Sequence, residues 1–64
     1  MGLGDMENDL SKAQHYRDQA AHMRELAAKD TNEETRKALL SLAENYDRLC
    51  LRFLKAGGIA PGAL

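Results

Sequence analysis

The feature that constrains this chain most is the spacing of its apolar residues in the second half. Large apolar side chains recur every three or four positions, at Leu39, Leu42, Tyr46, Leu49 and Phe53. This alternation follows the 3.6-residue period of an α-helix and cannot follow the two-residue period of a strand. It predicts an amphipathic helix over about residues 32–55, which the glycines at positions 57 and 58 would end.

A second helix is predicted in the first half of the chain, over about residues 11–29. This segment contains no glycine or proline and is rich in residues with high helix propensity. Ser11 followed by Gln14 has the pattern of a capping box, and Thr31 followed by Glu34 repeats that pattern before the later helix. Residues 1–10, which include two glycines, are expected to form a flexible lead-in.

The two predicted helices are separated by only a few residues, so they should fold back on each other as an antiparallel hairpin. Pro61 prevents any further helix, and we expect residues 57–64 to form a mobile tail. The 64 residues suffice for one domain, and a two-helix chain of this length closes only a thin core. The sequence therefore predicts an all-α fold whose stability needs help from another surface.

The apolar faces of the two helices differ in width. The face of the first helix is a stripe roughly 80° wide in which three of five members are alanine, whereas that of the second spans roughly 160°. One alanine-rich helix cannot cover the wider face, so we expect two hairpins to form a dimeric four-helix bundle. The predicted interface comprises Ala13, Tyr16, Ala20, Met23, Ala27, Leu39, Leu42, Tyr46, Leu49, Cys50 and Phe53. A larger protein partner or a self-sufficient monomer are the alternatives.

Few residues suggest chemistry. His15 and His22 lie seven positions apart with Asp18 between them, which makes them weak candidates for metal ligands, but no zinc-binding spacing is present. Cys50 lies within the apolar face of its helix, where a thiol is inert, and an interchain disulfide is the alternative. No nucleophile and base can be paired, so the sequence predicts neither an enzyme nor a cofactor.

Charge and targeting signals limit the classes of partner. Nine Lys and Arg residues are balanced by ten Asp and Glu residues, giving a formal net charge of −1. The cations are interleaved with acids along both helices, which argues against a nucleic-acid surface. No apolar run is long enough to span a membrane, and one cysteine without an export signal indicates a reducing cytoplasm.

The order of residues also resembles that of short, uncharacterised bacterial helical-hairpin proteins. The resemblance rests on YRxxAxxxRxLA, which starts at Tyr16, and on RxxLLxLAxxYxxL, which starts at Arg36. It implies a bacterial cytoplasmic hairpin and brings no known activity. Together, these features predict a non-enzymatic protein–protein interaction module that self-associates, or alternatively a small accessory subunit or adaptor that docks on a larger protein.

Overall fold

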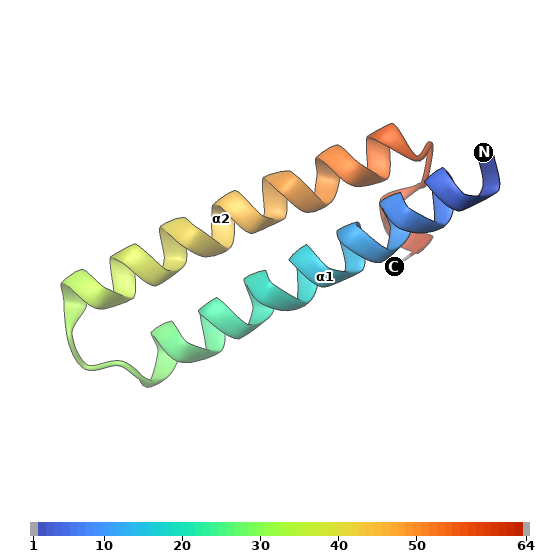
Figure 1. The fold of residues 1–64 in the computed structure, drawn as a ribbon. Helices are drawn as coiled ribbons and strands as arrows, with labels where there is room; N and C mark the ends of the chain where they lie inside the picture. The colour runs from blue at the N-terminus through green and yellow to red at the C-terminus, as the bar shows by residue number, and fades with distance from the viewer. Residues whose placement is uncertain (1, 64) are drawn as a thin grey trace.

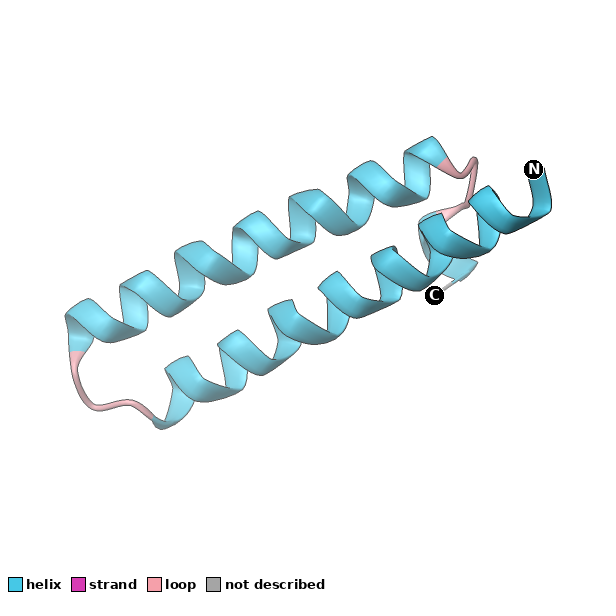
Figure 2. Ribbon diagram, viewed as in Figure 1, coloured by secondary structure: helices cyan, strands magenta, loops and turns pink. Residues whose placement is uncertain are grey.

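The computed structural model describes the backbone of residues 2–63 and the side chains of residues 8–63. Helix α1 (Gly2–Lys29) and helix α2 (Glu33–Ala56) lie side by side and antiparallel, and one turn of 3-10 helix, η1 (Pro61–Ala63), follows (Figures 1 and 2). The hairpin is elongated, with extents of 46 × 19 × 14 Å, and both ends of the chain lie at the same end of it (Figure 1). The predicted all-α hairpin is confirmed.

The first helix is longer than the sequence suggested. It begins at Gly2 and not near Ser11, so Ser11 lies in its middle and the predicted Ser11–Gln14 capping box is wrong. The segment contains three acidic residues, which the positive end of the helix dipole favours, and no proline. Most of the predicted lead-in is therefore helical, while Met1 and Leu64, at the ends of the predicted lead-in and tail, lie outside the described residues.

The turn between the helices has only three residues, Asp30 to Asn32. The Asp30 carboxylate accepts a hydrogen bond from the Asn32 amide at 2.8 Å, and the Asn32 side chain accepts one from the Thr35 amide at 3.1 Å. Asn32 is therefore the N-cap of α2, and the predicted capping box of Thr31 with Glu34 is wrong. Asparagine caps at least as well as threonine, and the Asp30 bond sets the helix boundary one residue later.

The chain reverses direction after α2. Gly58 adopts a φ of 65°, a left-handed conformation that glycine enters without steric cost, and its amide bonds to the carbonyl of Lys55. The next amide, of Ile59, donates to the carbonyl of Leu54 at 2.8 Å. Ile59 then packs against the core, so this part of the predicted mobile tail lies on the hairpin and does not extend away from it.

Small residues line the contact between the two helices. Among the side chains of residues 8–63, the buried ones are Ala13, Ala20, Ala27, Ala43, Cys50 and Leu54. Alanine lets two helix backbones approach closely, and we call this line of buried residues the seam. The largest side chain within it is Leu54, so the buried core is thin, as the length of the chain led us to expect. Neither α1 nor α2 meets the length and hydropathy needed to cross a membrane.

Candidate protein–protein interface

Three aromatic rings flank the seam on one side of the hairpin. The ring of Tyr16 on α1 stacks against Tyr46, with centroids 5.8 Å apart, and against Phe53, with centroids 5.6 Å apart. The Lys12 ammonium nitrogen lies 5.2 Å from the centroid of the Phe53 ring. All three rings are only partly buried. This cluster joins the two helices and leaves part of its aromatic surface in solvent.

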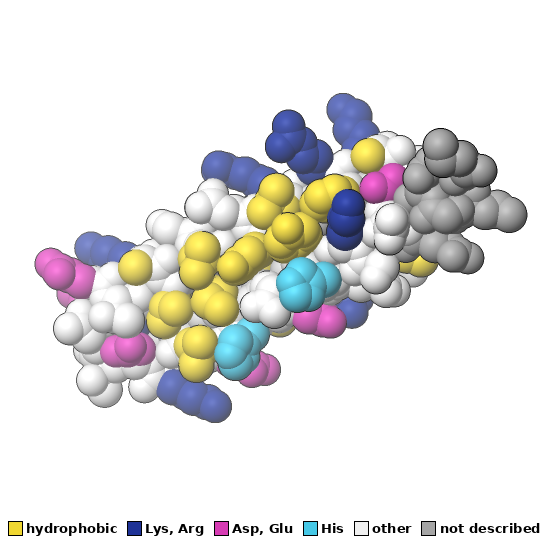
Figure 3. Space-filling model, viewed as in Figure 1, with side chains coloured by type: hydrophobic (Ala, Val, Ile, Leu, Met, Phe, Trp, Pro, Cys, Tyr) yellow, Lys and Arg dark blue, Asp and Glu magenta, His cyan; other side chains and the backbone are white. Residues whose placement is uncertain are grey.

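The aromatic cluster belongs to a longer apolar band. Met23 lies two turns beyond Tyr16 on α1, and Leu39 lies two turns before Tyr46 on α2, so both continue the same side of the hairpin. Figure 3 shows hydrophobic side chains running along the molecule over both helices, with the two histidines at the border. We call this band the apolar strip; its members are Tyr16, Met23, Leu26, Leu39, Leu42, Tyr46, Leu49 and Phe53. Leu26 and Leu42 are each 39% exposed.

The opposite side of the seam is polar. There Arg24 of α1 donates a hydrogen bond to Asp47 of α2 and forms an ion pair with it. This hydrogen bond, together with the charge of Asp47, raises the pKa of Arg24 above its usual value. Leu40 and Leu51 lie seven and four residues from Asp47, so they share its side of α2, where both are exposed as separate side chains. The hairpin therefore has one side with the continuous apolar strip and another, which we call the polar side, with the ion pair and two separate exposed leucines.

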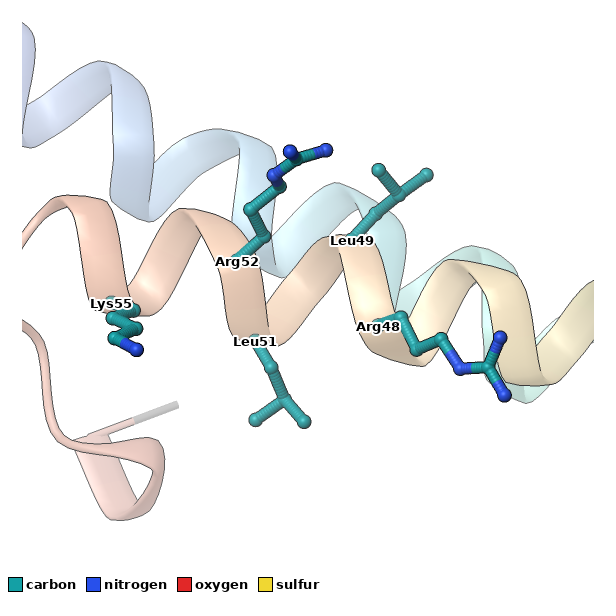
Figure 4. Close-up of a pocket in the computed structure, with 5 residues that line it drawn as sticks. All are labelled: Arg48, Leu49, Leu51, Arg52 and Lys55. Atoms are coloured by element: carbon teal, nitrogen blue, oxygen red, sulfur yellow. The ribbon is translucent and has the colours of Figure 1, made fainter.

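A shallow depression of about 330 Å³ lies on the outer surface of α2, between Arg48, Leu49, Leu51, Arg52 and Lys55. These side chains fan out from a single helix, and Leu49 and Leu51 point in opposite directions (Figure 4). Ligand sites in proteins are concave and enclose most of the ligand. This space between long side chains on a convex helix lacks the walls that would hold a small molecule.

The predicted interface residues divide between the seam and the apolar strip. Ala13, Ala20, Ala27 and Cys50 are buried between the two helices of the single hairpin, and their role as contacts to a second chain stays a prediction. The alanines and the thiol allow the closest approach of the two helices, and packing drives them into the seam. The remaining predicted residues lie on the strip. Leu26 was not predicted, although its position three residues after Met23 could have shown that it continues the strip.

Two of the three residues considered for metal binding have other contacts. His15 packs edge-on against Tyr16, with ring centroids 5.4 Å apart, and Asp18 pairs with Arg17 at 3.4 Å. Among the side chains of residues 8–63, no group of three or more His, Cys, Asp or Glu residues is arranged to hold a metal ion. These observations leave His15, Asp18 and His22 as surface residues of α1.

Cys50 is a free thiol within the seam. Burial raises its pKa above the usual value of 9.0, and the nearby charge of Asp47 raises it further, while Arg17 acts in the opposite direction. A thiol with a raised pKa is a poor nucleophile at neutral pH because the thiolate is the reactive form. In this position Cys50 fills space between helices of its own chain.

No family model, curated protein or solved structure matches this chain. The apolar strip is the feature of the molecule that a proposed function has to explain.

Proposed function

We propose that this protein is a non-enzymatic interaction module that self-associates, with two hairpins packing their apolar strips together to form a four-helix bundle. The observation that carries the proposal is the difference between the two sides of the hairpin. On one side, the Arg24–Asp47 pair closes the seam with charged groups. On the other, eight apolar residues from both helices form one continuous band that a single chain leaves partly uncovered.

Covering the strip would stabilise an assembly appreciably. Complete burial of a leucine side chain is worth about 1.5 to 3 kcal/mol. Because Leu42 is 39% exposed in one hairpin, covering the rest of it would contribute about 0.6 to 1.2 kcal/mol in each chain. In a symmetric dimer both copies of each strip residue are covered, so each such contribution to the free energy of association counts twice. A second hairpin would also give each helix a second neighbour, as in a four-helix bundle.

Two leucines of α2 provide a matched test. Leu42 lies on the apolar strip and is 39% exposed, whereas Leu51 lies on the polar side and is 54% exposed. Leu42→Asp should weaken the dimer at least tenfold, because both copies lose apolar burial and would place a carboxylate in the interface. Leu51→Asp should leave the dimer intact. Exposure alone would predict the reverse order, since Leu51 is the more exposed of the two.

The measurement is solution mass by light scattering after size exclusion, with helicity followed by circular dichroism over a hundredfold dilution. We expect twice the 7.1 kDa mass of the chain for the wild type and for Leu51→Asp. A wild-type monomer that keeps its helicity would refute self-association. A monomer that has little helicity at every concentration would also refute it, and would indicate that a different protein covers the strip.

A further inference from the structure

We propose that the two hairpins of the dimer are antiparallel, with the turn of one chain lying against the end of the other that carries the chain termini. This inference rests on the proposed self-association and specifies its geometry. It follows from the charged residues that border the apolar strip, which have opposite signs at the two ends of the hairpin.

The first pair of charges borders the strip on α1. Lys12 and Asp30 are eighteen residues apart, which is five helical turns, so they lie on one line along the helix. Lys12 is at the end with the chain termini, where its ammonium group reaches over Phe53 on the strip. Asp30 is at the turn, where its amide still bonds to the carbonyl of Leu26 and extends the line of α1.

A second pair repeats this arrangement on α2. Glu34 and Arg52 are also eighteen residues apart and therefore share one line along the helix. Arg52 is near the end of α2 that lies beside the termini, and its side chain points to the same side as Leu49 of the strip (Figure 4). Glu34 is in the first turn of α2, next to the loop. Each pair thus has its cation at the end with the chain termini and its carboxylate in the turn or beside it.

These signs distinguish the two symmetric ways of stacking the hairpins. In a parallel dimer, Lys12 would approach Arg52 of the other copy, and Asp30 would approach its Glu34, so like charges would meet at both ends. In an antiparallel dimer, each cation lies at the end where the other copy carries its carboxylates. Charge complementarity of this kind selects orientation and register even where it adds little affinity.

The two pairs also require the same register. In an antiparallel dimer the two-fold axis passes midway between paired residues, which is position 21 on α1 for Lys12 with Asp30, and Ala43 on α2 for Glu34 with Arg52. Within one hairpin Lys12 lies over Phe53, and a Cβ added at Gly57 would be 3.0 Å from that of Asp9. Following this pairing of α1 with α2 toward the middle of the hairpin places position 21 opposite residues 44–45. These residues lie within about 3 Å of Ala43 along the helix, so the two charge pairs place the two-fold axis at nearly the same point.

The distance between the two turns tests this orientation directly. A Cys50→Ala, Thr31→Cys chain carries one spin label at the exposed turn, and its light-scattering mass shows whether it is a dimer. Double electron–electron resonance should give about 30 to 40 Å between labels, because each turn lies about ten residues from the axis. A dimer with labels about 10 to 20 Å apart would overturn the antiparallel orientation and keep self-association. A monomeric wild type would remove both proposals.

Charge reversal at Arg52 gives a second test, because it should change the dissociation constant in opposite directions for the two orientations. In the antiparallel dimer, Arg52→Glu faces the other copy's Glu34 and should weaken association about tenfold, and adding Glu34→Arg to the same chain should restore it. In a parallel dimer, Arg52→Glu would face Lys12 and tighten association. Arg48→Glu is the control, because Arg48 extends from α2 in a different direction (Figure 4) and should change the dissociation constant little.

Discussion

Leu54 offers the sharpest test of the packing inside a single hairpin. It is 2% exposed and is the largest side chain in the seam, whose other members are alanines and Cys50. It clusters with Ala13 and Cys50, and Ile59 of the chain end packs against this cluster. If the seam holds the two helices together, then removing most of this one side chain should destabilise the whole fold.

The expected effect of Leu54→Ala follows from its burial. Replacing a buried leucine by alanine costs about 2 to 5 kcal/mol, and the cost falls where the surroundings can relax into the cavity. Leu54 lies near the end of a thin hairpin, so we expect a loss of about 2 to 3 kcal/mol. A chain of 64 residues has a total stability of roughly 3 to 10 kcal/mol, so this loss is a large fraction of it.

Urea unfolding followed by circular dichroism, at one fixed protein concentration, measures this difference. Leu51→Ala is the matched control, because Leu51 is in the same helix but 54% exposed, and it should cost less than about 1 kcal/mol. A loss below about 1 kcal/mol for Leu54→Ala, or equal losses for the two variants, would refute the inferred role of the seam.

Two further predictions concern the turn and the buried thiol. Asn32→Ala should lower the free energy of unfolding by about 0.5 to 2 kcal/mol in the same urea assay, because the Thr35 amide loses its acceptor, whereas Asn32→Asp should retain most of the stability. The raised pKa of folded Cys50 means that its thiol ionises first in the unfolded chain, so its contribution is complete below about pH 9.0 and is lost as the pH rises further. The free energy of unfolding, measured from pH 7 to 10, should therefore decline less steeply for Cys50→Ala than for the wild type. Identical slopes would contradict the raised pKa of Cys50.

The type and pairing of the helices could be predicted from sequence because they depend on periodicity and on a short connection. The ends of the helices could not, because several side chains compete for each boundary. At the turn, Asn32 prevails over Thr31 through a bond that depends on the position of Asp30. At the N-terminus, α1 extends through a segment that has no apolar period of its own, and the acidic residues of this segment are favoured by the helix macrodipole.

The position of the apolar strip was only partly predictable for a different reason. The width of the apolar face of α2 is evident from the sequence, but not which line within that face turns toward α1. The line that includes Ala43 and Cys50 lies in the seam because small side chains permit the closest approach of the helices. Larger residues such as Leu42 and Leu49 are consequently displaced to one side, where they form the apolar strip.

The one-sidedness of the hairpin has a consequence for the size of any assembly. A molecule with adhesive surfaces on two opposite sides can add copies without end and grow into a filament, whereas a single self-complementary surface closes after one partner. The Arg24–Asp47 pair occupies the side from which a third hairpin would have to be recruited. The same ion pair that closes the seam would therefore also stop further hairpins from adding, so the assembly would stay finite.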